Sequence, residues 1–341
     1  MHLGRHIYVS PQSKAPLECR PSRTEGEVVA EGELVGPSGE SYPIRDGIPD
    51  LTFPRELAPA DREARAYYDD AAAVYDDVAN LTFRIQYVDE RKARESFVAA
   101  LELRPDSRVL ELACGTGRDS EIIAERLGPA GSLYLQDLSR AMLTRCRERL
   151  RGISTPAEFS TANASFLPFP DRTFDAVFSF GGLGVFGDAG QALREIVRVA
   201  KVGAKVVVGD ESMPPWLRDT EYGRILLHNN RLFEKAVPLE DVPVEARDVV
   251  LRWVIGGVYY LLEFRVGEGE PRADFDLEIP GRRGGTLRTR YQGRLEGVSP
   301  EAKELAERAR AKTGKSMFQW LDEVVRAAAE NDLGSPPRKR R

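Results

Sequence analysis

The sequence predicts an α/β fold with a largely parallel sheet, preceded by a small β-rich unit and followed by a helical extension. Two observations support this prediction. Apolar strand-like runs alternate with amphipathic helical runs between residues 84 and 266, which is typical of parallel sheets. In contrast, residues 28–49 contain short strand-like runs separated by Gly and Pro turns, and residues 299–330 have a helical pattern interrupted at Gly314.

The turn around Gly115 and Gly117 is predicted to bind a ligand. A buried strand, Arg108–Leu112, passes through this turn into an amphipathic helix at 120–127, for which Gly128 is the expected C-cap. Small residues let a ligand lie against the backbone, and the helix N-terminus favours a negative group. A third glycine is missing at the spacing that nicotinamide and flavin sites require, so such a site is not expected.

Asp137 ends the next predicted strand, residues 132–137, about 20 residues beyond the glycine turn. A carboxylate at this place can accept hydrogen bonds from both hydroxyls of a ribose. The alternative is that Asp137 caps the helix that begins near Arg140, with Ser139 as the rival cap.

A third segment, residues 161–182, has a polar turn, a proline-containing turn and a hydrophobic strand in that order. Ligands collect at the carboxyl ends of such strands in open α/β sheets, so Ser179 and the glycines after it are candidate site residues. The marker residues of the segment are Asn163, Ala164, Leu167, Pro168, Phe169, Phe174, Asp175, Gly181 and Gly182.

In these three segments the chain resembles the class I S-adenosylmethionine (SAM) dependent methyltransferases, whose first motif reads acidic-x-small-x-Gly-x-Gly. Glu111, Ala113, Gly115 and Gly117 match that motif, with Ala where Gly is commoner. The resemblance covers residues 64–266 and is to the ubiquinone-biosynthesis-like group. It implies a Rossmann-like seven-stranded sheet and in-line transfer of a methyl group from S-adenosyl-L-methionine to a small-molecule acceptor, with S-adenosyl-L-homocysteine as product.

The same resemblance implies roles for individual residues. Asp137 would hold the ribose, Leu138 would pack on the adenine, and the Asn163 oxygen would accept from the adenine amino group without bringing a charge. Tyr68 and Tyr75 would close over the methionine end; seven residues apart, they would share a helix face, although both rings could simply be buried. The predicted cofactor contacts are Tyr68, Tyr75, Glu111, Ala113, Cys114, Gly115, Gly117, Asp137, Leu138, Asn163, Ala164 and Ser179.

The sequence singles out no strong base, and Cys114 is expected to pack beneath the glycine turn rather than act as a nucleophile. His228, within a predicted helix over 216–233, is the candidate catalytic residue, because this segment often lines the acceptor pocket in the resembled family. The alternative is a half-exposed helix histidine. Asp210 and Glu211, at the end of a predicted strand over 205–210, are further candidates.

Residues 1–54 resemble a small zinc-ribbon-like family through the stretch Tyr42–Pro49. Ser10 and Ser13 stand where that family has thiols, and serine hydroxyls are poor zinc ligands, so a ribbon without metal is expected. A site built from His2, His6 and Cys19 is the alternative.

Three further segments complete the predicted organisation: a SAM-binding domain at 62–270, an extension at 271–334 with a basic strand or loop and two helices, and a basic tail at 335–341. The stretch Arg282–Arg294 could hold an anionic acceptor or be a solvated loop. The helices could form a homodimer contact; their likeness to ribbon-helix-helix DNA-binding dimers is only generic.

The composition of the 341-residue chain limits which classes of partner are expected. A net charge of −5 favours a small-molecule acceptor over nucleic acid, and no apolar run approaches the length of a membrane span. Three scattered cysteines give no disulfide framework and predict a cytoplasmic protein. The alternatives are an RNA or protein methyltransferase that docks through the ribbon and the Arg-rich stretch, and a SAM-binding scaffold without transferase activity.

Overall fold

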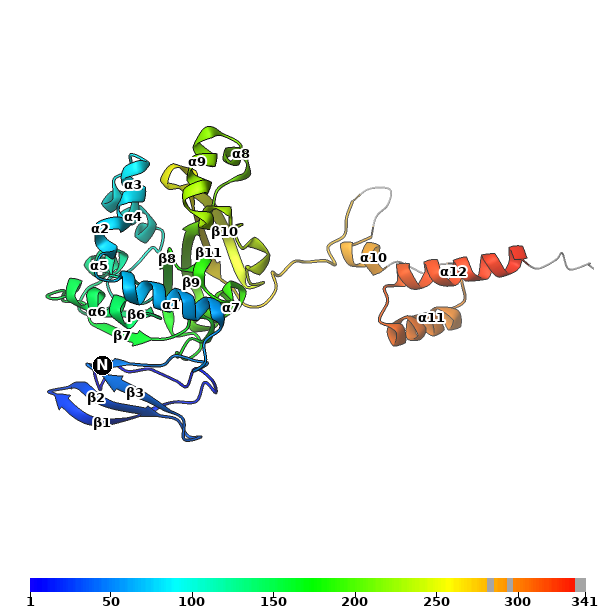
Figure 1. Cartoon of the computed structure of the whole chain (residues 1–341). Coiled ribbons are helices and arrows are strands. Elements are labelled where there is room, and N and C mark those ends of the chain that lie inside the picture. The colour runs from blue at the N-terminus through cyan, green and yellow to red at the C-terminus, as the bar shows by residue number, and fades with distance from the viewer. Residues whose placement is uncertain (281–284, 293–296, 335–341) are drawn as a thin grey trace, which may run out of the picture. The chain divides into compact units, whose positions relative to one another are not determined.

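The computed structural model describes residues 1–280, 285–292 and 297–334 (Figure 1). These residues belong to two compact units, Met1–Pro271 and a second unit that begins at Arg272. Arg282, Arg283, Arg294 and the basic tail at 335–341 lie outside the described residues. Within the described ranges no helix is long and apolar enough to cross a membrane.

The first unit is built on a seven-stranded sheet with the order β10-β11-β9-β8-β5-β6-β7. Strands β5 to β9 pair in parallel, and β11 pairs antiparallel with both of its neighbours. A hairpin around Gly256 and Gly257 joins β10 to β11, and only β11 runs antiparallel to the other strands, because β10 has the same direction as β9. The strands are β5 Arg108–Leu112, β6 Ser132–Asp137, β7 Ala157–Thr161, β8 Phe174–Phe180, β9 Ala200–Glu211, β10 Ala246–Val254 and β11 Tyr259–Val266.

Two helical runs of this unit are interrupted. At the start of the alternating region, Leu81–Ile85 and Glu90–Ala99 are separate helices on either side of Tyr87, which has a φ of 55° and is 99% exposed. The predicted helix over 216–233 is α8, α9 and a 3-10 turn, and α5 ends before an extended Leu127, so Gly128 does not cap it. The helices are α1 Pro59–Ala71, α2 Tyr75–Ala79, α3 Leu81–Ile85, α4 Glu90–Ala99, α5 Arg118–Arg126, α6 Arg140–Arg149, α7 Ala189–Val199, α8 Pro215–Arg218 and α9 Glu221–Asn229.

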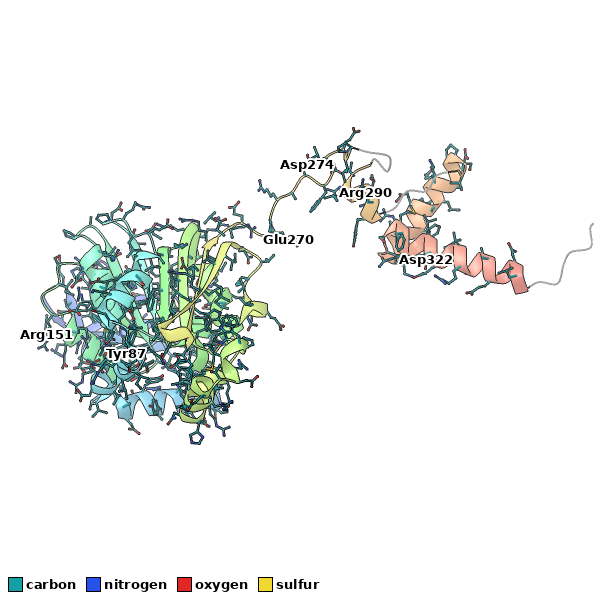
Figure 2. The ribbon with its side chains drawn as sticks, turned by 90° about the horizontal axis from the view of Figure 1, so that it is seen from above. Tyr87, Arg151, Glu270, Asp274, Arg290 and Asp322 are labelled. Carbon is teal, nitrogen blue, oxygen red and sulfur yellow. The ribbon has the colours of Figure 1, made fainter. Side chains whose placement is uncertain are left out.

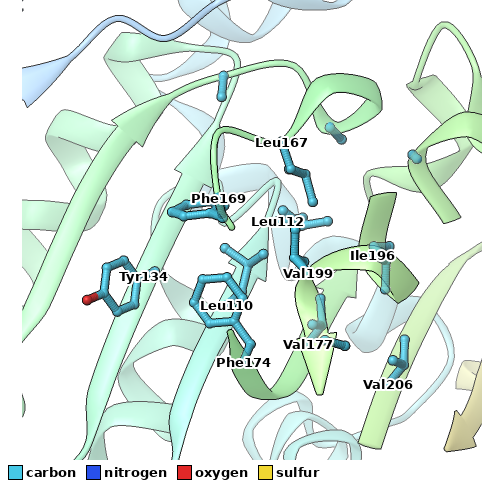
Figure 3. Close-up of a cluster of buried hydrophobic side chains, with 14 of the residues drawn as sticks. Leu110, Leu112, Tyr134, Leu167, Phe169, Phe174, Val177, Ile196, Val199 and Val206 are labelled. Carbon is cyan, nitrogen blue, oxygen red and sulfur yellow. The ribbon is translucent and has the colours of Figure 1, made fainter. Parts of the chain in front are cut away.

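Successive side chains along each strand point to opposite faces of the sheet, so one hydrophobic core forms on each face. Leu110 of β5 and Val206 of β9 point into a core with α7, as Figure 3 shows, whereas Val109 and Val207 point into a second core with α4, α5 and α6. Because both faces of the sheet are covered, the central strands consist mainly of apolar residues.

The N-terminal unit is a four-stranded antiparallel sheet that shares the α7-side core. Its buried Leu34, Ile44 and Tyr8 belong to the same cluster as Tyr134 and Phe169 of the large sheet. The strand β1 has no counterpart among the predicted strands. The bounds are β1 Glu18–Glu25, β2 Val28–Val35, β3 Ser41–Arg45 and β4 Ile48–Pro49.

This small sheet also covers the edge of the large one. After β4, Asp50 forms a parallel bridge with Thr161 of β7, and the Leu51 N–H donates to the Thr161 carbonyl at 2.8 Å. The connection from β7 to β8 contains only the 3-10 turn Ala164–Phe166. The β7–β8 connection thus provides no α-helix to cover the large sheet. The N-terminal sheet covers that part of the face instead.

The turn where a zinc ribbon would have its first thiols is held by hydrogen bonds. The Ser10 hydroxyl accepts from the Ser13 N–H at 3.2 Å, and the Ser10 carbonyl accepts from the Lys14 N–H at 2.8 Å. Throughout the described part of the chain, no three His, Cys, Asp or Glu side chains gather so that they could hold a metal ion. The degenerate zinc-ribbon assignment stays a prediction.

The second unit is helical, and Figure 2 marks Asp274, Arg290 and Asp322 in it. The predicted helical pair is present, with Ser299 as N-cap and Gly314, at a φ of 69°, as C-cap of the first helix. Residues 287–292, predicted as part of a strand or loop, are helical instead. The helices are α10 Leu287–Gln292, α11 Pro300–Thr313 and α12 Met317–Gly334.

Candidate active site

A pocket lies at the carboxyl ends of the parallel strands; it spans about 860 Å³, a volume that includes space open to solvent. Its walls come from α1, α2 and α4, from the glycine turn after β5, and from the segments that follow β6, β7 and β8. The predicted contacts that line it are Tyr68, Tyr75, Ala113, Cys114, Gly115, Asp137, Leu138, Asn163 and Ala164.

The two glycines of the turn serve different purposes. Gly115 has a φ of 55°, and a Cβ there would meet nothing within 4 Å, so its backbone faces open space. Gly117 has a φ of 85°, and a Cβ there would lie 2.7 Å from the Cys146 sulfur of α6. Gly115 thus keeps the cavity open, and Gly117 lets α6 approach the turn.

Ala113, which stands where glycine is commoner in the resembled family, packs directly against Gly182. Its φ is 50°, a left-handed conformation that costs a side-chain-bearing residue about 1–2 kcal/mol. A Cβ on Gly182 would lie 2.4 Å from the Ala113 Cβ. Glycine at 182 therefore makes room for the Ala113 methyl group.

The Asp137 carboxyl is held between the glycine turn and the start of α6. Its Oδ2 accepts from the Gly115 N–H at 2.9 Å, and its Oδ1 accepts from the Ser139 N–H at 2.8 Å. Burial raises its pKa to about 6, although these two hydrogen bonds oppose the shift. The cap of α6 is Ser139, whose hydroxyl accepts from the Met142 N–H at 3.2 Å, so Asp137 is not the cap.

Asn163 is bound to Asp61, a residue that the sequence pattern did not single out. The Asn163 Nδ2 donates to the Asp61 carboxylate at 2.9 Å, and its Oδ1 accepts from the Ser165 N–H at 2.9 Å. The other Asp61 oxygen accepts from the Gly187 N–H at 2.7 Å. A carboxylate at 163 would instead face the Asp61 carboxylate, which explains why an amide is found there.

Three aspartates of the segment α1–α2 form hydrogen bonds with the turns that line the cavity, each with a different turn. Asp61 holds Asn163 after β7, and Asp69 accepts from the Ser139 hydroxyl after β6 at 2.6 Å. Asp76 accepts from the Thr116 hydroxyl of the glycine turn at 2.6 Å. The segment thus contacts all three turns that line the cavity.

Tyr68 and Tyr75 both line the cavity, but they do not share a helix face as predicted. The helix α1 ends at Ala71 and α2 begins at Tyr75, so the seven-residue spacing does not apply. The interruption between α1 and α2 nevertheless brings the two rings together edge to face, with 6.1 Å between their centroids. Burial raises the pKa of Tyr75 to about 12 and also raises that of Tyr68, so both phenols are neutral.

The sequence interpretation missed the three arginines of the cavity wall, which are Arg65, Arg94 and Arg118. Arg94 of α4 donates to Glu90 at 2.8 Å and pairs with Asp119, while its guanidinium lies 5.7 Å from the centroid of the Phe180 ring. Arg118 donates to Glu90 at 2.8 Å. Only the Glu90–Arg94 spacing of four residues could have indicated a pair, because α4 lies outside the recognised motifs.

Six predicted site residues do not line the cavity, two of which are Asp210 and Glu211 at the end of β9. Glu111 is buried beneath the glycine turn, where burial and the Asp119 charge raise its pKa well above the usual range. Ser179 is buried within β8, and its hydroxyl has no hydrogen-bond partner among the described residues. Gly117 faces α6, and His228 lies exposed in the last turn of α9. The structure gives the predicted catalytic role of His228 no support.

The strand order, the glycine turn and the acidic residue at the end of β6 define the class of this domain. Residues 109–203 match the profile of the methyltransferase domain family. This part of the chain is a class I SAM-dependent methyltransferase domain.

Several similar curated proteins are bacterial. The chain is 39% identical to the ubiquinone/menaquinone biosynthesis C-methyltransferase UbiE of Xanthomonas campestris over 132 residues, which are 38% of this chain and 52% of that protein. It is 40% identical to the UbiE of Xylella fastidiosa strain M12 over 120 residues, 35% of this chain and 47% of that one. The chain thus spans about half the length of these relatives.

Two similar solved structures align with this chain at TM-scores below 0.5. A SAM-dependent methyltransferase from Aquifex aeolicus has a TM-score of 0.42 and 21% identity, over 58% of this chain and 98% of that one. Phosphoethanolamine N-methyltransferase 2 of Haemonchus contortus, in complex with S-adenosyl-L-methionine, has a TM-score of 0.48 and 13% identity, over 64% and 62% of the two chains.

S-adenosylmethionine is the cofactor of this class of domain, and the cavity fits its parts. Asp137 offers a carboxyl group at the place expected for a ribose, and the open backbone of Gly115 lies beside it. Arg94, which already binds Glu90 and Asp119, contributes a buried guanidinium to the wall, and the rings of Tyr75 and Phe180 offer aromatic surface. A nucleoside, an amino-acid carboxylate and a sulfonium each have a matching group.

Proposed function

We propose that this protein transfers a methyl group from SAM to a small-molecule acceptor. The observation that carries the proposal is the cavity itself, in which a carboxyl group (Asp137), a cation (Arg94) and aromatic rings line one space. Each corresponds to one part of SAM, and together they would fix the orientation of the molecule.

We assign the contacts as follows. Asp137 accepts from the ribose hydroxyls, and Leu138 and Ala164 pack on the adenine. Arg94 pairs with the carboxylate of the methionine part, because guanidinium groups bind carboxylates strongly. The Tyr75 and Phe180 rings lie near the sulfonium, since aromatic faces attract cations.

SAM supplies an activated methyl group, so the chain has mainly to align the acceptor and exclude water. The segment α1–α2, fastened by Asp61, Asp69 and Asp76, covers the cavity and serves the second purpose. Tyr68 and Tyr75, which are neutral phenols, are placed to orient the acceptor through their hydroxyl groups.

A small-molecule acceptor is supported by the names of the relatives, which are C-methyltransferases of ubiquinone and menaquinone biosynthesis. It is also supported by the N-terminal sheet, which uses its apolar side within the molecule rather than for docking a macromolecule. We further infer a cytoplasmic location, given three free cysteines. A homodimer through α11 and α12 is a second inference, based on the exposed Phe318 and Val325 of α12.

The test is transfer of radiolabelled methyl from SAM into an extract of cells that lack the protein, followed by separation of small molecules, RNA and protein. Asp137→Ala is the negative control, and His228→Ala should leave the rate within about twofold because His228 lies outside the cavity. Label in the small-molecule fraction would support the proposal and yield the acceptor. Label in RNA or protein would refute the small-molecule acceptor, and no label despite intact SAM binding would indicate a scaffold.

A further inference from the structure

The connection between α3 and α4 is joined by a side chain to α9 and to the β10–β11 hairpin, elements that Figure 1 labels. Gln86 follows α3, and its Oε1 accepts from the Tyr222 hydroxyl of α9 at 2.7 Å, although the two residues are 136 positions apart. The same hydroxyl lies 2.9 Å from the Gly256 carbonyl oxygen of the hairpin, which also accepts from it. A Cβ at Gly256 would lie 2.1 Å from Gln86 Oε1, so glycine makes room for this contact. We call Gln86, Tyr222 and Gly256 the latch.

The segment that ends at the latch, residues 75–86, buries few side chains. It contains α2, which buries no residue, and α3, which buries only Phe83. Near its other end, Asp76 accepts from the Thr116 hydroxyl of the glycine turn at 2.6 Å. Because so little apolar surface is buried, hydrogen bonds near its two ends contribute much of what holds this segment in place. Segments of this kind open locally at a lower free energy than the core does.

The segment 75–86 covers the part of the cavity that we assign to the methionine part of SAM. The Phe83 ring of α3 lies against the Arg94 guanidinium, with 5.1 Å between the guanidinium carbon and the ring centroid. The same guanidinium lies 5.7 Å from the centroid of the Phe180 ring, and both Arg94 and Phe180 line the cavity. Tyr75, the first residue of α2, lines it as well. Movement of this segment would therefore uncover Arg94 and open this end of the cavity.

Two residues with a strained backbone adjoin the latch, one on each side of it. Tyr87, which Figure 2 labels, follows Gln86 and has a φ of 55°, and Ile255 precedes Gly256 and has a φ of 49°. The left-handed region is unfavourable for residues with a side chain, and most of all for a β-branched one such as Ile255. Such strain persists only where the surrounding contacts impose it. Relief of the strain on release would offset part of the lost hydrogen bonding, which allows the latch to open.

We propose that residues 75–86 are a lid over the methionine end of the SAM site and that the latch sets how often this lid opens. The inference rests on the proposed function, because it uses the assignment of Arg94 to the carboxylate of SAM. With the latch closed, Phe83 covers Arg94, and water is kept from the sulfonium. With the latch released, SAM enters and S-adenosylhomocysteine leaves. Gln86 and Tyr222 are positioning residues, since they act through the lid.

The experiment measures, by surface plasmon resonance, how fast S-adenosylhomocysteine binds to the full-length protein and leaves it. The variants are Gln86→Ala and Tyr222→Phe, and Tyr291→Phe is the matched control, because Tyr291 is exposed in the second unit. Both variants should raise the association and the dissociation rate constants by about 3–10-fold, since one hydrogen bond contributes about that factor to the closed state. A lid that opens more often speeds both steps alike, so Kd should stay within about twofold. Tyr291→Phe should behave as wild type.

Amide hydrogen exchange tests the lid in the wild-type protein, so it decides the inference even where a variant fails to fold. The amides of residues 75–86 should exchange faster than those of α5 and α6, and S-adenosylhomocysteine should slow them. In Tyr222→Phe they should exchange faster still. Unchanged rate constants in folded variants, a change in Kd that comes from one rate constant alone, or wild-type exchange at 75–86 as slow as in α5 would overturn the inference. A wild-type protein that does not bind S-adenosylhomocysteine would instead refute the proposed function.

Discussion

The Asp61 carboxylate of α1 accepts a hydrogen bond from the Asn163 side-chain amide at 2.9 Å, although the two residues are 102 positions apart. This contact joins the segment that covers the cavity to the turn expected to hold the adenine. It also explains why residue 163 is an amide and not an acid, because the negative charge is already provided by Asp61.

The first prediction follows from this pair. Asn163→Asp should reduce the free energy of unfolding by about 1–3 kcal/mol at neutral pH, because two buried carboxylates would face each other and the donor to Asp61 would be lost. The exchange Asp61→Asn with Asn163→Asp restores one donor and one charge, so it should recover most of the loss. Urea denaturation measures both; a double variant no more stable than the single one would contradict the pairing.

The second prediction concerns the ribose. Asp137→Ala should weaken SAM binding by about 1.5–3 kcal/mol, through the loss of charge-assisted hydrogen bonds. Calorimetry measures the affinity, with Asp106→Ala as a control because this exposed aspartate lies outside the cavity. Equal affinity of the Asp137 variant and wild type would remove the ribose assignment.

The third prediction is the pH dependence of SAM binding. The ribose hydroxyls require the carboxylate form of Asp137, whose pKa is raised to about 6 by burial. Affinity should therefore be constant above about pH 7 and fall by up to about tenfold per unit below pH 6. Titrations between about pH 5 and pH 8 measure this. Asp137→Asn should bind weakly and without this dependence, and a wild-type affinity that stays flat to pH 5 would argue against the assignment.

The fourth prediction separates the two glycines of the turn. Gly117→Ala combines a left-handed backbone with a Cβ 2.7 Å from the Cys146 sulfur, so it should cost about 2–4 kcal/mol of folding stability. Gly115→Ala meets no neighbour within 4 Å and should cost only about 1–2 kcal/mol, while weakening SAM binding. The thermal transitions of both variants measure the difference, and similar losses would show that Gly117 is not constrained by α6.

The central sheet could be predicted because each strand, turn and helix is encoded locally. The alternation of apolar strands with helices predicts its α/β architecture, and the resemblance adds the seven-stranded sheet that β5 to β11 form. The glycine turn and Asp137 could be recognised for the same reason, since turn, strand end and spacing lie within one short stretch of chain.

Contacts between distant segments could not be predicted in this way. Nothing near Asp61 or Arg94 in the sequence indicates that α1 and α4 bring them to the cavity. The alanine run before Tyr75 favours a continuous helix, yet α1 ends at Ala71, because the fastening of Asp69 and Asp76 to different turns outweighs intrinsic helix propensity. His228 was singled out for its chemistry and for the place of its segment in the resembled family, and neither indicates which way a helix faces.

The shared core beneath β7 has a consequence for anyone who wishes to shorten this protein. Truncation at residue 54 would remove Leu34 and Ile44 and expose the rings of Tyr134 and Phe169 to water. It would also free the edge of β7, and an uncovered strand edge promotes aggregation. A fragment that begins at residue 55 should therefore precipitate on expression, although it retains every motif of the methyltransferase resemblance.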